Sequence, residues 1–177
     1  MILDAQQMFD LPDAPRDLAQ VAGSYASTNI LDYGVIDGIP SEANGGGARD
    51  MGIGHYELKI FVQVITAFAG GTSLQVSFQG SIDDGSGGVA AWTTWMSSAA
   101  IADASLTAGN RIWRIDFPRP PAGIAIPRFC RLLYTTLGTH TAGTVVAGVV
   151  LDRDDQPFAG TNSGVLGGYP AGITVAN

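Results

Sequence analysis

Side chains that act as nucleophiles, general bases or metal ligands are scarce in this chain of 177 residues. His55 and His140 are its two histidines, no His-x-His pair occurs, and Cys130 is its single cysteine. A metal centre of the cupin kind needs several histidines and a carboxylate around one ion, and a nucleophile needs a base beside it. We therefore expect no metal site and no catalytic triad. We interpret His140 as capping a turn and Cys130 as a small core residue in a strand.

Acidic residues cluster at Asp83-Asp84 and again in the run 152–155. Such clusters can bind calcium or serve a glycosidase, but neither matches the twelve-residue calcium loop. We expect turn carboxylates that accept hydrogen bonds from backbone amides. The glycine run 44–47 lacks the lysine and the following helix of a phosphate-binding loop. The sequence thus predicts no enzyme activity and no cofactor, and an enzyme built on an unrecognised carboxylate pair is the alternative.

Three tryptophans, Trp92, Trp95 and Trp113, are candidates for a sugar-binding platform like those of many β-sandwich modules. Trp113 alternates with Ile115 and Phe117, however, and this spacing indicates a core position. A carbohydrate-binding or host-attachment module of a virion therefore stays open as an alternative function. Exposed, coplanar tryptophans are the feature that would favour it.

Arginines recur in pairs, at Arg111 and Arg114 and at Arg128 and Arg131, within two predicted strands. We expect their guanidinium groups near strand ends or on a solvent-facing side. Arginine suits planar, partly desolvated contacts with carboxylates, so all four are candidate contacts with a partner. Ion pairs with the acids of this same chain are the alternative.

The composition favours a protein partner. Apolar types make up 46% of the chain and charged types 14%, against roughly 25% charged in typical domains. A charge-poor surface often faces another protein, although a β domain rich in small residues has the same composition. The formal net charge of −7 repels phosphate, so we expect neither nucleic acid nor a membrane as a partner.

Period-two alternation is the main secondary-structure signal in the middle of the chain. Apolar residues recur at every second position over residues 56–68 and 74–82, and the Gly70-Gly71 turn between them predicts a hairpin. Further strands are predicted over residues 30–35, 110–117, 129–136 and 144–151. The last is apolar on both faces and should be central. The sequence therefore predicts an all-β, jelly-roll-like antiparallel β-sandwich, with a closed barrel as the alternative.

Both ends differ from this middle. Apolar anchors spaced among Gly, Pro, Ala and Asp suit an extended arm that lies across a neighbouring surface. We therefore predict an N-terminal arm over 1–26, a sandwich over 27–153 and a Gly-rich C-terminal arm over 154–177. Loops folded onto their own domain are the alternative. The candidate contact residues in these arms are Leu3, Phe9, Leu11, Leu18, Leu166, Tyr169 and Ile173.

Short motifs follow one another along most of the chain in a recognisable order. They occupy residues 1–6, 27–32, 58–64, 67–68, 74–79, 106–109, 127–132 and 141–145. In this order the chain resembles the cement or decoration proteins of tailed-phage capsids, specifically the Bordetella-phage cement protein family. The insertion over 39–54 and the Gly-rich tail depart from the family's pattern.

The resemblance implies a jelly roll that binds the exterior of an icosahedral capsid and clamps neighbouring major capsid proteins. It implies two partners, the major capsid protein and further copies of this chain, with a dimer favoured over a trimer. It also implies assembly in the host cytoplasm and a final place in the virion. Multivalent contacts repeated by symmetry suit such a role, because no single strong site is needed.

Overall fold

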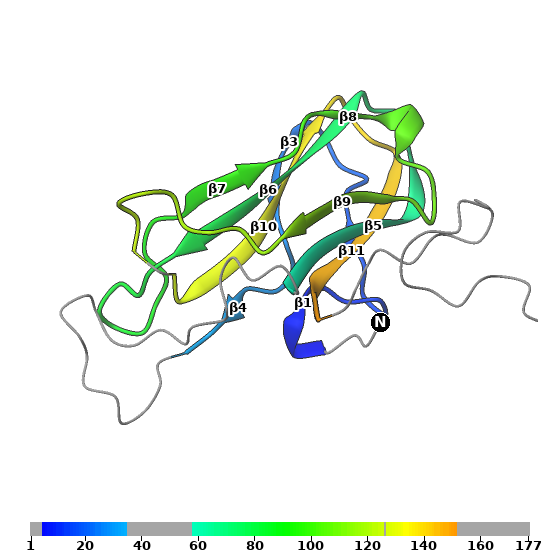
Figure 1. Ribbon diagram of the computed structural model, residues 1–177. Coiled ribbons are helices and arrows are strands. Elements are labelled where there is room, and N and C mark those ends of the chain that lie inside the picture. Colours follow the sequence, from blue (N-terminus) through cyan, green and yellow to red (C-terminus); the bar gives the residue numbers. More distant parts are fainter. Residues whose placement is uncertain (1–4, 35–57, 126, 152–177) are drawn as a thin grey trace, which may run out of the picture.

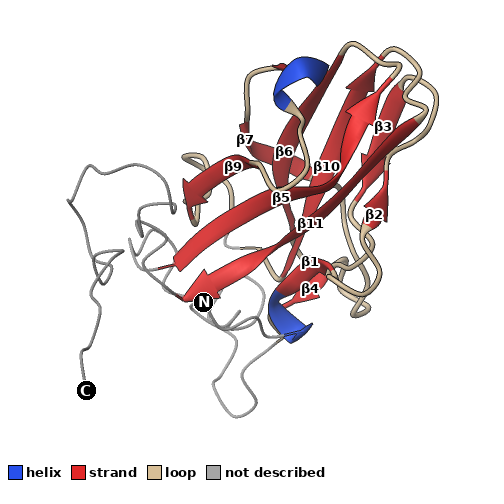
Figure 2. Cartoon of the chain, turned by 90° about the vertical axis from the view of Figure 1, so that its right-hand side faces the viewer, coloured by secondary structure: helices blue, strands red, loops and turns tan. Residues whose placement is uncertain are grey.

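The computed structural model describes residues 5–34, 58–125 and 127–151. These residues form eleven strands and two short 3-10 helices, η1 (Ala5–Gln7) and η2 (Asp103–Ser105). The strands make two antiparallel sheets that face each other (Figures 1 and 2). The predicted all-β antiparallel sandwich is therefore confirmed.

The five-stranded sheet has the order β1-β11-β5-β9, and β2 pairs with β11 beside β1. Its strands are β1 (Met8–Asp10), β2 (Arg16–Asp17), β5 (Leu58–Ala69), β9 (Arg111–Asp116) and β11 (Ala142–Leu151). The predicted central position of β11 is confirmed, since it has pairing partners on both edges.

The six-stranded sheet has the order β3-β10-β6-β7, with β4 paired to β10 and β8 paired to β6. Its strands are β3 (Gly23–Ala26), β4 (Leu31–Asp32), β6 (Ser73–Ser81), β7 (Thr93–Ser97), β8 (Ile101–Ala102) and β10 (Phe129–Leu137). Along the chain, β1 and β2 belong to the five-stranded sheet, β3 and β4 to the six-stranded sheet, and β5 to the five-stranded sheet again. β6, β7 and β8 follow in the six-stranded sheet, and β9, β10 and β11 then alternate between the two sheets.

The predicted hairpin around Gly70-Gly71 is wrong. β5 lies in the five-stranded sheet and β6 in the six-stranded sheet, so the turn between them crosses from one sheet to the other. Gly70 has φ +84° there, a conformation that favours glycine. The alternation of both strands was read correctly, but their apolar faces meet across the core instead of lying side by side in one sheet.

One apolar layer fills the space between the sheets. Phe78 lies at its centre and makes edge-to-face contacts with Phe9, Trp95 and Phe117, with ring centroids 5.3 to 6.2 Å apart. The fully buried side chains of this layer include Phe9, Leu18, Ile60, Val62, Val64, Leu74, Val76, Phe78, Leu106, Cys130, Leu132, Tyr134, Val145 and Ala147. Cys130 is a core residue, as predicted, and burial raises the pKa of its thiol above the ordinary range.

The predicted N-terminal arm is corrected from residue 5 onward. β1 and β2 pair with β11, and β3 pairs with β10, so this segment contributes strands to both sheets. Phe9 and Leu18 are 0% exposed in the core of their own domain and cannot reach a neighbouring molecule. Leu11 packs against a smaller cluster of Met8, Phe61, Val146 and Val150, which face away from the main core. Leu3 and the predicted C-terminal arm, with Leu166, Tyr169 and Ile173, lie outside the described residues.

The central apolar layer generates a stability prediction. Leu132→Ala removes a fully buried side chain from β10 and should lower the free energy of unfolding by about 2 to 5 kcal/mol. Leu137→Ala, on the same strand but 60% exposed, is the matched control and should change it by less than about 0.5 kcal/mol. Urea unfolding followed by circular dichroism measures both. Equal effects would contradict the assignment of Leu132 to the core.

Candidate protein interface

The outer side of the six-stranded sheet is polar and nearly uncharged. Along β10, Cys130, Leu132 and Tyr134 belong to the core, so Leu133 and Thr135 point outward between them. We call this surface the polar face. Its members are Ser24, Gln75, Ser77, Gln79, Thr94, Ser97, Arg131, Leu133 and Thr135. Arg131 is the only charged residue in this set.

Hydrogen bonds between strands tie the side chains of the polar face together. The hydroxyls of Ser77 and Ser97 lie 2.8 Å apart, and Gln79 Nε2 donates to Thr94 Oγ1 at 3.0 Å. Because these polar atoms already have some of their partners, another surface can cover them while leaving fewer donors and acceptors unsatisfied. The polar face is therefore chemically suited to contact with a protein.

Arg131 is held flat against this face. Its Nε donates to Gln79 Oε1 at 2.8 Å, and its guanidinium carbon lies 4.1 Å from the ring centroid of Trp92. The cation–π contact and the hydrogen bond fix a planar group in an uncharged surface. Of the four predicted arginines, Arg131 is the one that the structure places on the polar face.

Arg128 forms an ion-pair cluster at the end of the same sheet. Its Nε and Nη2 donate to the two carboxylate oxygens of Asp32 at 2.8 and 2.9 Å, and its Nη1 donates to Asp83. These bonds connect the residue before β10 to β4 and to the β6–β7 loop. The hydrogen bonds from Arg128 hold the pKa of Asp32 below its ordinary value. The alternative of pairing within the chain therefore holds for Arg128.

The acidic turn after β6 is a capped turn. Asp83 Oδ1 accepts from the amides of Gly85 and Gly87, and Asp84 Oδ1 accepts from those of Ser86 and Gly88. The hydrogen bonds from the backbone amides of Gly87 and Gly85, and to a smaller extent the hydrogen bond from Arg128, hold the pKa of Asp83 below its ordinary value. The predicted role of these acids as acceptors for backbone amides is confirmed.

Arg111 and Arg114 lie on β9, an edge strand of the five-stranded sheet, whereas Arg131 lies on β10 of the six-stranded sheet. Burial, followed by the charge of Arg114, lowers the pKa of Arg111. Arg114 is exposed. The four arginines therefore do not form one patch.

The tryptophans do not line up as a platform. Trp113 is 8% exposed and belongs to the core, as predicted. Trp92 lies under Arg131, whereas Trp95 packs inward on Phe78, with ring centroids 5.4 Å apart. Three aromatic rings that face three different surroundings cannot stack together on one sugar chain.

His140 closes one end of the sandwich. Its Nε2 lies 2.8 Å from Asp103 Oδ1, and its backbone amide donates to Gln20 O at 2.9 Å. A Cβ on Gly71 would lie 2.2 Å from the ring, so only glycine fits there. His140 thus joins three loops and sits in the turn before β11, as predicted. His55 and the acidic run 152–155 lie outside the described residues.

Within the described ranges, no group of three or more His, Cys, Asp or Glu side chains is arranged to hold a metal ion. Nor does any helix among the described residues have the length and apolar character needed to cross a membrane.

A buried carboxylate, Asp10, links the two sheets. Tyr134 Oη donates to Asp10 Oδ2 at 2.6 Å, and the Thr28 amide donates to Oδ1 at 2.8 Å. Desolvation raises the pKa of Asp10 above 3.8 despite these bonds, and burial raises that of Tyr134. Asp10 lies on β1 and Tyr134 on β10, so the bond spans the core. No local sequence pattern predicts this pair.

The Arg128 cluster predicts a response to acid. The pKa values of Asp32 and Asp83 are lowered in the fold, so their stabilisation is present above the ordinary carboxyl pKa of about 4 and is lost as the pH falls through their lowered values. Arg128→Ala should lower the melting temperature at neutral pH and flatten this acid-side loss. The control is Arg119→Ala, at an exposed position in the loop between β9 and β10. An unchanged acid slope in Arg128→Ala would contradict the cluster's role.

The Asp10–Tyr134 pair predicts a pH-dependent cost of substitution at Tyr134. Tyr134→Phe leaves the buried carboxylate without one donor and should cost about 1 to 3 kcal/mol of unfolding free energy. Because the pKa of Asp10 is raised and Tyr134 donates to its ionised form, the cost should grow as the pH rises above the ordinary carboxyl range and Asp10 ionises. Tyr25→Phe removes an exposed hydroxyl that donates to Val21 O, and should show a small, pH-independent effect. A pH-independent cost for Tyr134→Phe would overturn this reading.

Comparison with known proteins gives one family. No match to a curated protein was found. A model of the Bbp16 family matches residues 17–149, from β2 to within β11, and so spans most of the chain and of both sheets. The chain therefore belongs to the Bbp16 family, a Bordetella phage protein family.

Proposed function

We propose that this protein is a cement or decoration protein that binds the exterior of a tailed-phage capsid and stabilises contacts between major capsid proteins. Membership of a phage protein family supports a place in the virion. The observation that carries the proposal is the polar face, a sheet surface with one charged side chain and hydrogen bonds between its own residues.

A surface such as the polar face suits a structural role. A polar surface with a single charged side chain can be covered while burying few charges, whose desolvation would oppose association. Each contact is modest, but copies arranged by icosahedral symmetry act together. In this proposal the protein is a homo-oligomer, with a dimer favoured, and catalyses no reaction. The net charge of −7 keeps it from nucleic acid and favours the outer side of the shell.

Charges placed on the polar face test the proposal. Ser24→Glu with Thr94→Glu puts two carboxylates on exposed positions of this face. Burying them against a capsid should weaken binding at least about ten-fold, which corresponds to about 1.4 kcal/mol. The measurement is co-sedimentation of the purified protein with empty shells of its own phage's major capsid protein, over a range of concentrations.

Ser105→Glu with Thr107→Glu adds the same charge at exposed positions outside the polar face and should leave binding unchanged. If the unmodified protein fails to sediment with the shells, the cement function is wrong. If both double variants bind like the unmodified protein, the capsid contacts another surface.

A further inference from the structure

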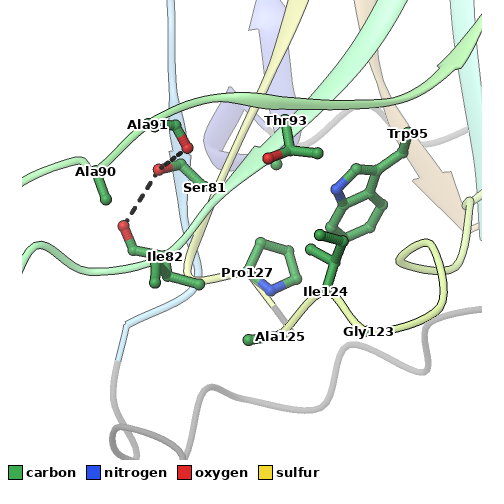
Figure 3. A pocket seen from close by; sticks show the side chains of 11 residues that line it. Ser81, Ile82, Ala90, Ala91, Thr93, Trp95, Gly123, Ile124, Ala125 and Pro127 are labelled. Atoms are coloured by element: carbon green, nitrogen blue, oxygen red, sulfur yellow. Dashed lines mark hydrogen bonds between the residues drawn. The ribbon is translucent and has the colours of Figure 1, made fainter.

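A cavity of about 240 Å³ opens between β7 and the loop that joins β9 to β10 (Figure 3). Side chains that line it include Ile82, Thr93, Trp95, Ile124 and Pro127, and no charged residue is among the lining residues. The volume exceeds the roughly 150 Å³ of an engineered apolar cavity that admits benzene. The cavity therefore has room for one aliphatic or aromatic side chain, and its walls select an uncharged one.

Trp95 forms a rigid wall of this cavity. Its ring packs against Phe78 on the core side and lies over Gly80, where a Cβ would come within 2.5 Å of the indole. A larger residue at position 80 would therefore displace the ring. Trp95 is thus fixed from behind, and the cavity is formed before any occupant arrives.

The indole N–H of Trp95 is an unused donor. Its Nε1 is buried and has no hydrogen-bond partner among the described residues. Figure 3 shows this nitrogen on the side of the ring that faces Thr93 and Pro127, across the cavity. Because this atom has almost no accessible surface and the ring is fixed, an occupant is expected to meet the indole as an apolar wall and not as a hydrogen-bond donor.

The mouth of the cavity is apolar as well. Ile82 is 46% exposed and Ile124 is 42% exposed, and both line the cavity. An occupant would cover these side chains in addition to filling the space behind them. Its apolar part must therefore be larger than the single group that enters the cavity.

β7 itself offers a second binding element. It is the last strand in the order β3-β10-β6-β7, and no described strand pairs with its other edge. Backbone groups on such an edge can pair with an extended peptide, and alternate side chains of that peptide then point into adjoining pockets. Thr93 and Trp95 belong both to β7 and to the cavity wall, so strand and cavity are continuous.

We propose that an extended, uncharged peptide segment of a partner protein pairs with the free edge of β7. It inserts one aliphatic or aromatic side chain into the cavity beside Trp95. This proposal goes beyond the capsid contact of the polar face and does not depend on it, because cavity and polar face lie on opposite sides of β7.

Nuclear magnetic resonance of the ¹⁵N-labelled full chain tests the proposal without any capsid. The probes are pentapeptides with blocked ends, with valine and threonine around a central Leu, Phe, Pro, Asp or Lys. At least one apolar-centred peptide should shift the Trp95 indole resonance and the β7 amides in a saturable way. The Asp- and Lys-centred peptides should not. Trp95→Phe assigns the indole resonance and, by removing part of the apolar wall, should weaken binding about five-fold.

A matched pair of variants locates the binding. Thr93→Phe fills the cavity and should abolish peptide binding, whereas Thr94→Phe, one residue further on the polar face, should leave it intact. Binding that survives Thr93→Phe, or no saturable shift with any peptide, would overturn the proposal.

Two other occupants would also overturn it. If N-acetyl-leucine methylamide binds as tightly as the leucine pentapeptide, the cavity takes a small molecule and β7 takes no strand. If the Trp95 indole and β7 resonances move with protein concentration alone, the occupant is a second copy of this chain.

Discussion

The apolar layer between the two sheets is the constraint on which every other feature depends. The sheets share no strand, so side-chain packing and the crossing loops hold them together. A buried hydrogen bond also crosses the layer. Tyr134, on an inner strand of one sheet, donates to the Asp10 carboxylate at an edge of the other. Packing around Phe78 fixes Trp95 as well, and so shapes the cavity beside β7. Interior and surface are thus set by the same contacts.

The inward-facing and outward-facing residues of β7 and β10 have different roles in our proposal. Their inward residues supply the core, and their outward residues supply a polar face whose hydrogen bonds are made within the sheet. A surface of this kind gains affinity from area and repetition, because no single group on it binds strongly. At the margin of this face, Arg128 is paired with Asp32 and Asp83. A low charge content and membership of a phage protein family both fit that division.

Sequence patterns predicted the long strands and missed what depends on distant partners. β5, β6 and β10 were predictable because each strand has nine or more residues, which is long enough for the alternation of apolar and polar side chains to be visible. β1 has three residues and β2 has two, which are too few to show a period. The sequence pattern therefore predicts an arm there, with Phe9 and Leu18 as its anchors. Strand pairing was also beyond reach, since alternation gives the buried face of a strand and not its sheet.

The candidate interface shows the same limit. The outward Ser and Gln residues of β6 could be read from the alternation, and the core position of Trp113 from its neighbours. The contacts of Arg131 with Trp92 and of Tyr134 with Asp10 join residues 39 and 124 positions apart. No local pattern reports such pairs. The cavity has the same origin, because its walls come from three segments, around residues 80–82, 90–95 and 123–127, that meet only in the folded sandwich.

A cryo-electron microscopy reconstruction of the protein bound to shells of its own phage's major capsid protein tests the central claim most directly. The account predicts density on the outer surface of the shell at symmetry-related positions, with the polar face of the six-stranded sheet turned toward the capsid. An undecorated shell, or density in which that face points to solvent, would contradict it.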